Sequence, residues 1–237
     1  MEQNKITILS TRPLTESLID EAKEQAVYIE VLPFIETESI KSVEVQQEIE
    51  LVLLESATIV FTSMNAVEAV ADYMIDEQPD WAIYCMGNTT QELVKKYFGE
   101  HSIAGTAGSA AELADVIVED AQTEEVVFFC GDQRRDELPD ILQVHNIEVN
   151  EIQVYHTIPV SHKIDKFYNG ILFFSPSAVE SFFKKNKAGG QTILFAIGKT
   201  TAASIKKHTS NTVIISDEPG KENLVGKAIN YFVYNER

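Results

Sequence analysis

FAIGKTTAAS, at residues 195–204, ends an apolar run in a glycine and then places Lys-Thr-Thr where a helix is expected to begin. Residues 84–93, with the sequence YCMGNTTQEL, repeat this arrangement. Each stretch joins a strand-like run to an amphipathic segment through Gly-x-Thr-Thr. The chain therefore contains the same strand-to-helix junction twice, which indicates an α/β fold with an internal duplication.

A phosphate-binding loop is the first function to consider for a Gly-Lys-Thr sequence. A Walker A loop needs another glycine five residues before its Gly-Lys-Thr, so that backbone N–H groups can wrap a phosphate. Ile193 occupies that position, and the first copy has Asn88 in place of the lysine. Neither copy belongs to a G-x-G-x-x-G fingerprint. Nucleotide binding is therefore disfavoured.

Aligning the two junctions brings the rest of the chain into register. The matching pairs are 58–70 with 170–182, 111–117 with 222–229, 5–13 with 125–133, and 28–37 with 150–158. The repeat period is about 110 to 120 residues, which is too long for a solenoid and suits a duplicated α/β unit.

Each half alternates apolar, β-rich runs with amphipathic segments. Strands are predicted at 5–10, 27–34, 58–62, 82–86, 102–104, 126–130, 147–156, 171–174, 193–197 and 212–215. Helices are predicted at 14–25, 43–54, 64–76, 89–97, 109–120, 134–144, 177–187, 200–207 and 222–231. Most of the strands are apolar on both faces, as parallel strands covered by helices are. The pattern predicts two flavodoxin-like α/β lobes, each a five-stranded parallel sheet flanked by helices.

Two extended segments interrupt this alternation at equivalent places in the repeat. VLPFIETE contains Pro33 and VYHTIPVSH contains Pro159. Proline holds the preceding residue in extended geometry, so both segments are predicted to be linker strands, at 33–37 and 154–159. If both cross between the lobes, lobe 1 combines residues 1–34 with 158–237, and lobe 2 is continuous over residues 38–153.

The charge and hydropathy of the chain limit the classes of partner that it can have. Its 237 residues include 37 acidic and 19 basic side chains, for a formal net charge of −18. Nucleic-acid binding needs a basic surface, so that class is disfavoured. The longest apolar runs, EVVFFCG and GILFFSP, are too short to span a bilayer. The N-terminus lacks the basic and apolar regions of a signal peptide, so we expect a cytoplasmic protein without membrane contact.

The cysteine and histidine spacing offers no metal site or redox motif. Cys85 and Cys130 each end an apolar run far from the other, as buried reduced thiols do. The five histidines form no H-x-x-x-H pair. With no nucleotide fingerprint either, we expect neither a metal nor a cofactor.

Short polar boxes follow the predicted strands throughout the chain. They read STRP, TSMN, GNTT, GTAGSA, GDQRR, SPSA and GKTT. In open α/β sheets, ligands bind beyond the carboxyl ends of the strands, where helix N-termini attract anions. Ser and Thr are also the commonest N-caps, so any single box can be explained by capping alone. The number of boxes favours a ligand site, which we expect in a cleft between the lobes.

These boxes resemble the motifs of the uroporphyrinogen-III synthase family, the cofactor-free enzymes that close the tetrapyrrole ring. The resemblance rests on STRP with Arg12, FTSMNAV, FFSPSAV, GNTT, IGKTTA, VYHT at 154–157, and the Gly131-x-x-Arg134 segment. It covers essentially the whole chain in order. It implies two α/β lobes joined by a two-stranded ladder. It also implies cyclisation of hydroxymethylbilane, with inversion of the last pyrrole, to uroporphyrinogen III and water.

The resemblance also implies a set of site residues. Those expected to bind the carboxylates of the substrate are Arg12, Ser63, Asn65, Thr89, Thr90, Gly131, Arg134, Ser175, Pro176, Ser177, Ala178, Gly198, Lys199, Thr200 and Thr201. Arg135 is an alternative to Arg134 as a local positive charge. TSMN, Asn88 and Asp132 depart from the family pattern, so substrate contacts are expected from the second-half motifs more than from the first-half ones.

Tyr155 is the residue to which the resemblance gives a catalytic role. Loss of hydroxide from a hydroxymethylpyrrole is assisted by the pyrrole nitrogen, and a donor near the hydroxyl would help it leave as water. A phenol with a pKa of about 10 stays protonated at neutral pH and can donate. Packing of an aromatic ring in a linker strand explains Tyr155 equally well, and both roles can hold together.

Two other classes of protein fit part of the pattern. A cytoplasmic ligand-binding or sensing module would also place two α/β lobes around a cleft, without catalysis. A glycosyltransferase-like enzyme would usually need an Asp-x-Asp metal motif, which is absent. We expect a monomer whose partner is a linear tetrapyrrole with many carboxylates. A transient contact with the preceding enzyme of the pathway is a further hypothesis.

Overall fold

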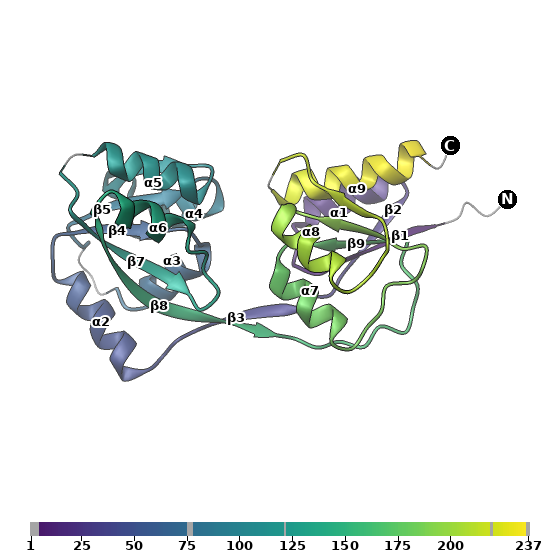
Figure 1. The fold of residues 1–237 in the computed structure, drawn as a ribbon, viewed down its shortest axis with the longest axis horizontal. Coiled ribbons are helices and arrows are strands. Elements are labelled where there is room, and N and C mark those ends of the chain that lie inside the picture. Colours follow the sequence, from purple (N-terminus) through teal and green to yellow (C-terminus); the bar gives the residue numbers. More distant parts are fainter. Residues whose placement is uncertain (1–4, 75–77, 121, 219, 236–237) are drawn as a thin grey trace. The chain divides into compact units, whose positions relative to one another are not determined.

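The computed structural model describes residues 5–74, 78–120, 122–218 and 220–235. The chain divides into two compact units. The discontinuous unit contains residues 1–36 and 158–237, and the continuous unit contains residues 37–157. Each unit is a sheet flanked by helices (Figure 1), so the predicted α/β class is confirmed.

The discontinuous unit contains a five-stranded parallel sheet. Its order is β11-β10-β9-β1-β2, with β1 at Ile6–Ser10, β2 at Val27–Val31, β9 at Gly170–Phe173, β10 at Ile193–Ala196 and β11 at Val213–Ile215. Helices α1 (Glu16–Glu24) and α9 (Lys221–Asn235) pack on one face, around Ile8 and Phe195. Helices α7 (Pro176–Phe183) and α8 (Lys199–Lys206) pack on the other, around Leu9 and Phe173. The strands are apolar on both sides because both faces are covered.

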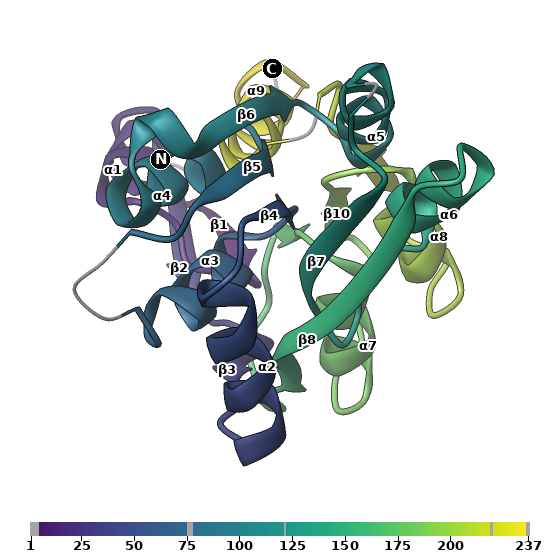
Figure 2. The same ribbon diagram turned by 90° about the vertical axis from the view of Figure 1, so that its left-hand side faces the viewer.

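The continuous unit contains a six-stranded sheet of order β3-β8-β7-β4-β5-β6. The strands are β3 (Ile35–Ser39), β4 (Ala57–Phe61), β5 (Trp81–Met86), β6 (Ile103–Ala107), β7 (Glu125–Gly131) and β8 (Glu148–Pro159). Helices α2 (Val43–Leu53), α3 (Met64–Ala71) and α4 (Thr89–Phe98) share one hydrophobic core. Helices α5 (Ala110–Glu119) and α6 (Glu137–Val144) share another, and a 3-10 turn, η1 (Glu100–Ser102), follows α4. Figure 2 shows this sheet between α3 and α4 on one side and α6 on the other.

The two units have the same topology in permuted chain order. The run β9-α7-β10-α8-β11-α9 corresponds to β4-α3-β5-α4-β6-α5, and β1-α1-β2 corresponds to β7-α6-β8. The chain leaves the discontinuous unit after β2 and returns to it through β8. The repeat register predicted from the Gly-x-Thr-Thr junctions therefore agrees with the order of strands in both sheets.

The prediction of five strands in each sheet is wrong for the continuous unit. Residues 35–39 form a separate strand, β3, which pairs with the long strand β8. The Val160 N–H donates to the Phe34 carbonyl and the Ile40 N–H to the Val154 carbonyl, so the two strands run antiparallel. The predicted strand 27–34 ends early, at Val31. The linker strand predicted at 33–37 overlaps β3, which begins at Ile35 and extends to Ser39; its extended geometry was indicated by Pro33 and not by an apolar run.

Helix boundaries differ from the prediction at a few ends. The helix predicted at 134–144 begins at Glu137, and the one predicted at 177–187 ends at Phe183. The helix predicted at 64–76 ends at Ala71, and residues 75 and 76 lie outside the described residues. No helix in the described ranges is long and apolar enough to cross a membrane.

Candidate functional site

The predicted binding boxes lie at the carboxyl ends of parallel strands, where helices begin. Ser63 caps α3 and accepts a hydrogen bond from the Asn65 N–H at 3.2 Å. Ser175, its counterpart in the other unit, caps α7 and accepts from the Ala178 N–H at 3.2 Å. Pro176 follows at the first helical position, and the Ser177 hydroxyl lies 3.0 Å from that of Ser175. These serines therefore act as caps, and a ligand would meet a helix N-terminus that is already formed.

The two threonines of each Gly-x-Thr-Thr box have different surroundings. Thr90 and Thr201 are buried, with exposed fractions of 7% and 1%. Thr89 and Thr200 are exposed in the first turns of α4 and α8. The second threonine of each box thus packs inward, while the first faces solvent beside the free N–H groups of the helix. Of each pair, only the first can present its hydroxyl to a ligand in this conformation.

Tyr155 lies in β8 and meets three other predicted site residues. Its hydroxyl donates to Ser63 Oγ at 3.1 Å, and the Asn65 side chain also hydrogen-bonds the phenol. A Cβ added to Gly131 would lie 2.3 Å from Tyr155 Cζ, so the absence of a side chain at Gly131 makes room for the ring. The β7–β8 register shifts between Cys130 and Gly131, which brings Gly131 opposite Tyr155. The structure therefore gathers residues that are up to 92 positions apart in the sequence.

The environment of the Tyr155 phenol keeps it protonated. Burial raises its pKa, and the hydrogen bond from the phenol to Ser63 opposes that shift. The ring also packs against the core formed by α2, α3 and α4. Both roles considered for Tyr155, donor and packing residue, are thus compatible with its position.

Arg134 follows β7 and is held by two carboxylates. Its guanidinium forms a bidentate ion pair with Glu151, with Nη2 2.6 Å from Oε1, and a further ion pair with Asp136. Its side chain is 23% exposed. A substrate carboxylate would have to compete with these partners, so the local geometry favours a role for Arg134 in joining this loop to β8. Its neighbour Arg135 is exposed and also has an interaction partner.

The carboxyl edge of the other sheet, in the discontinuous unit, carries basic residues. Arg12 follows β1 in a turn where the Ser10 hydroxyl donates to the Arg12 carbonyl at 2.6 Å. Gly198 precedes α8 in extended backbone, and Lys199 is exposed at the helix start. Lys221, at the start of α9, was not selected from the sequence. Burial, and then the charge of Arg12, lower the pKa of Lys221, so these two cations lie close enough to repel each other.

The candidate residues divide between the two units. The continuous unit holds Ser63, Asn65, Thr89, Thr90, Gly131, Arg134 and Tyr155. The discontinuous unit holds Arg12, Ser175, Pro176, Ser177, Ala178, Gly198, Lys199, Thr200 and Thr201. Assembly of both sets around one ligand stays a prediction.

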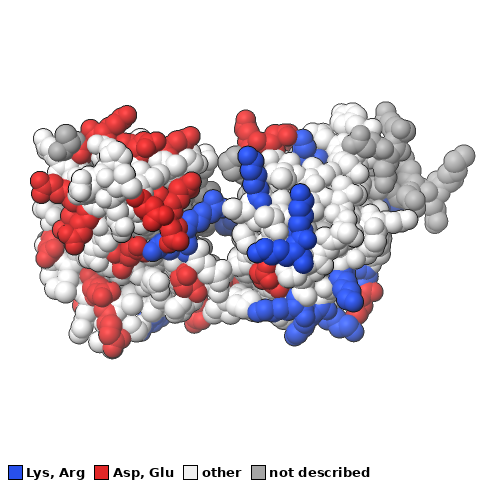
Figure 3. All heavy atoms as spheres, in the orientation of Figure 1, with Lys and Arg blue, Asp and Glu red and all other residues white. Residues whose placement is uncertain are grey.

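The formal charge of the chain is very unevenly distributed. The continuous unit has 24 acidic and five basic residues, for a net charge of −19, whereas the discontinuous unit has 13 acidic and 14 basic residues, for a net charge of +1. On the face drawn in Figure 3, carboxylates are spread over the continuous unit and Lys and Arg are prominent on the discontinuous unit. An anion therefore meets attractive potential mainly on the discontinuous unit.

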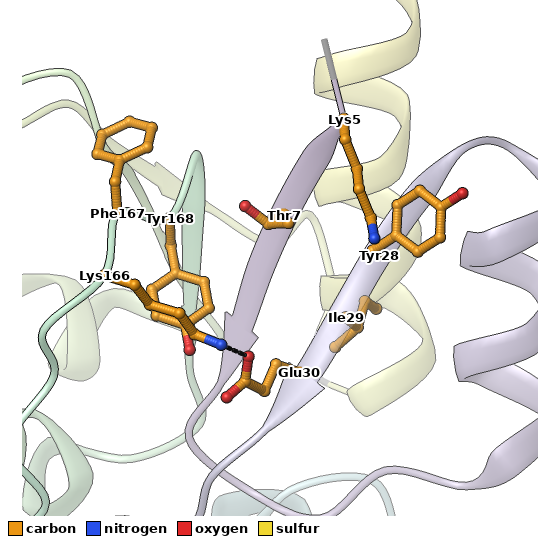
Figure 4. A pocket seen from close by; sticks show the side chains of 8 residues that line it. All are labelled: Lys5, Thr7, Tyr28, Ile29, Glu30, Lys166, Phe167 and Tyr168. Carbon is orange, nitrogen blue, oxygen red and sulfur yellow. Dashed lines mark hydrogen bonds and ion pairs between the residues drawn. The ribbon is translucent and has the colours of Figure 1, made fainter. Parts of the chain in front are cut away.

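A hollow lies in the discontinuous unit, beside the amino-terminal part of β1. In the continuous unit, α2 belongs to the core over the corresponding strands β7 and β8. The loop before β9 takes its place and leaves a cavity of about 300 Å³ (Figure 4), lined by Lys5, Thr7, Tyr28, Ile29, Glu30, Lys166, Phe167 and Tyr168. Lys166 pairs with Glu30 there, and Lys5 Nζ lies 4.0 Å from the Tyr28 ring centre. The charged side chains that line the cavity therefore interact mainly with other residues of its lining.

Metal and thiol chemistry have little support among the described residues. No group of three or more His, Cys, Asp or Glu within them is placed to hold a metal ion. Cys85 and Cys130 are buried free thiols, and burial raises the pKa of each to about 11. Neither is suited to act as a nucleophile.

Similarity to known proteins agrees with this geometry. A family model described as uroporphyrinogen-III synthase HemD matches residues 16–226. Uroporphyrinogen-III synthase of Saccharomyces cerevisiae is 24% identical over 202 residues, which cover 70% of this chain and 73% of the relative.

Solved structures share the fold. Uroporphyrinogen-III synthetase from Helicobacter pylori aligns with a TM-score of 0.66 at 16% identity, over 95% of this chain and 99% of that one. A mutant uroporphyrinogen III synthase from the extremely thermophilic bacterium Thermus thermophilus aligns with a TM-score of 0.63 at 12% identity, over 98% and 100%.

The family match, over a chain that folds as two permuted α/β units, places the protein among the enzymes of tetrapyrrole synthesis. The family model spans nearly the whole chain, and the chain belongs to the uroporphyrinogen-III synthase family. The predicted resemblance is thereby confirmed.

Proposed function

We propose that this chain cyclises hydroxymethylbilane, inverts the last pyrrole and releases uroporphyrinogen III and water. The observation that carries the proposal is the meeting of Tyr155, Ser63, Asn65 and Gly131 in a chain whose family model covers residues 16–226. The geometry supplies a protonated phenol that is oriented by a fixed hydroxyl and has room made for it by a glycine.

The reaction requires little more than positioning and one proton transfer. The C–O bond of the terminal hydroxymethyl group breaks as the pyrrole nitrogen supplies electrons. The Tyr155 phenol gives its proton to the leaving hydroxyl, which departs as water. The phenolate regains a proton when the pyrrole N–H gives up its own, leaving a neutral azafulvene. The last pyrrole then attacks through the α-carbon that already carries its bridging methylene, and the old bond to that methylene breaks to leave a second azafulvene. The free α-carbon of the turned pyrrole attacks this azafulvene and loses its proton, which closes the ring with inversion while the enzyme holds the two ends together.

The carboxylates of the substrate require donors and positive charge. Helix N-termini at α3, α4, α7 and α8 offer backbone N–H groups beside the predicted boxes. Lys199, Arg12 and Lys221 add charge on the discontinuous unit. We propose that this unit anchors the carboxylates while the Tyr155 cluster on the continuous unit acts on the hydroxymethyl end.

We further propose that the enzyme is a hydro-lyase that acts as a monomer in the cytoplasm. Free Cys85 and Cys130 support a reducing compartment. Hydroxymethylbilane is unstable, which supports transient contact with the enzyme that makes it. The net charge of −18 supports the absence of nucleic-acid partners.

The proposal is tested by adding the purified protein to hydroxymethylbilane freshly made by a synthase that precedes this step. The products are oxidised and the isomers separated by chromatography. Because hydroxymethylbilane cyclises spontaneously without inversion, the control without protein yields isomer I. We expect isomer III to predominate with the protein. If only isomer I forms although the substrate binds, the chain is instead a ligand-binding module.

A further inference from the structure

Asp132, immediately after Gly131, makes two hydrogen bonds to the segment of β8 that contains Tyr155. Its backbone N–H donates to the Tyr155 carbonyl at 3.2 Å. Its carboxylate Oδ1 accepts from the Thr157 N–H at 2.9 Å. The other carboxylate oxygen lies 3.6 Å from His156 Nδ1. One residue therefore holds β8 at Tyr155 and again two residues later.

These bonds continue the sheet beyond the end of a strand. β7 ends at Gly131, whereas β8 continues to Pro159. Beyond Tyr155, the edge of β8 that faces β7 has no further β7 residue to pair with. The Asp132 carboxylate accepts the Thr157 N–H there in place of a backbone carbonyl. An aspartate oxygen that replaces a backbone carbonyl is a common local device, and its charge strengthens the bond.

Gly131, the residue before Asp132, also limits where the ring of Tyr155 can lie. The register shift between Cys130 and Gly131 places the bare Cα of Gly131 beside the ring. The phenol reaches Ser63 Oγ only if the backbone at Tyr155 stays in its present register. A loss of the bond at Thr157 would free β8 next to the tyrosine and let the phenol drift from Ser63.

We propose that Asp132 is a positioning residue that fixes β8 so that the Tyr155 phenol points at its reaction partner. This inference rests on the proposed function, because it concerns the donor assigned there. The sequence departs from the family pattern at Asp132, so the device belongs to this chain and is not part of the resemblance.

The test compares Asp132→Ala with Asp132→Asn, because asparagine keeps an oxygen that can accept from Thr157 while losing the charge. Asp140→Ala is the matched control, since Asp140 is exposed on α6 and its side chain has no ion pair among the described residues. We expect kcat of Asp132→Ala to fall about tenfold, with KM and Tm close to those of the parent, because small misplacements of a catalytic group are costly. Asp132→Asn should stay within about twofold of the parent, because the accepting oxygen is retained.

Equal losses in Asp132→Ala and Asp132→Asn would overturn the proposal, because they would show that charge matters and positioning does not. The double variant Asp132→Ala with Tyr155→Phe should be no slower than Tyr155→Phe alone. Losses that multiply would also overturn it, because Asp132 would then act independently of Tyr155.

A readout independent of catalysis separates this inference from the proposed function. Protein labelled with ¹³C at the tyrosine Cζ gives a Tyr155 resonance that is assigned by its loss in Tyr155→Phe. We expect this resonance to shift or broaden in Asp132→Ala and to stay unchanged in Asp132→Asn and Asp140→Ala. An unchanged Tyr155 resonance in Asp132→Ala refutes the positioning role, even if Tyr155 proves dispensable for isomer III formation.

Discussion

Replacing Gly131 with alanine adds a single methyl group against the ring of Tyr155. The new Cβ would lie 2.3 Å from Cζ, 2.5 Å from Cε2 and 2.7 Å from the hydroxyl oxygen. Ordinary contacts begin near 3.4 Å, so the ring or the β7 end must move by about 1.1 Å. The phenol has little freedom to yield, because its hydroxyl is bonded to Ser63 and the ring packs on the core.

That displacement sets the expected size of the effect. Overpacking of this kind costs about 1–3 kcal/mol of unfolding free energy. A shift of about 1 Å at a catalytic group can reduce the rate by about a hundredfold. We therefore expect Gly131→Ala to lower kcat for isomer III by about two orders of magnitude while the protein stays folded. Initial rates, product isomers and thermal unfolding are measured on the same preparation.

Gly226→Ala is the matched control for Gly131→Ala. Gly226 lies in α9, and a Cβ there meets nothing within 4 Å. Because alanine favours helix more than glycine does, this variant should gain up to about 1 kcal/mol of stability and keep its activity. If Gly131→Ala retains parental kcat and isomer ratio, the close fit between Gly131 and Tyr155 has no part in catalysis.

Three further predictions follow from burial and charge. Cys85 and Cys130, whose pKa values burial raises to about 11, should resist a disulfide reagent at pH about 8 in the folded protein and react once it is unfolded; rapid labelling of native protein would contradict this. Thr201→Val should lower Tm and leave kcat/KM near the parental value, because this threonine is 1% exposed. Thr200→Val should lower kcat/KM and leave Tm near the parental value, because Thr200 is exposed; unfolding and rate measurements on each variant check both expectations. Because Lys199, Arg12 and Lys221 are proposed to attract the substrate carboxylates, kcat/KM should fall as salt screens that attraction between about 10 and 150 mM, and a rise would show that the net charge of −18 dominates.

Much of the fold can be predicted from the sequence because the signals for strands and helices are local. The Gly-x-Thr-Thr junctions mark strand ends and helix starts, and apolar runs mark strands that are covered on both faces. The duplication fixes the order of elements in both units. β3 has no apolar run, and Pro33 indicated only an extended segment at 33–37; its extension to Ser39 and its place beside β8 in the sheet are visible only in the structure.

The candidate site is harder to predict from the sequence, because its contacts join residues that are far apart in the chain. Sequence motifs select Tyr155, Ser63 and Gly131 separately, but their meeting depends on the register shift between β7 and β8. Asp132 looked like a departure from a motif, and its bond to Thr157 is visible only in the structure. Burial likewise separates Thr200 from Thr201, which the sequence treats alike.

The most direct test of the central claim removes only the Tyr155 hydroxyl. Tyr155→Phe keeps the ring packed on the core and loses the bond to Ser63, so Tm and KM should stay near the parental values. A positioned acid contributes about a hundredfold or more, so the rate of isomer III formation from hydroxymethylbilane should fall by about that factor. Isomer I, from spontaneous closure, should take its place among the products. Near-parental isomer III formation by Tyr155→Phe would contradict the claim and leave Tyr155 a packing residue.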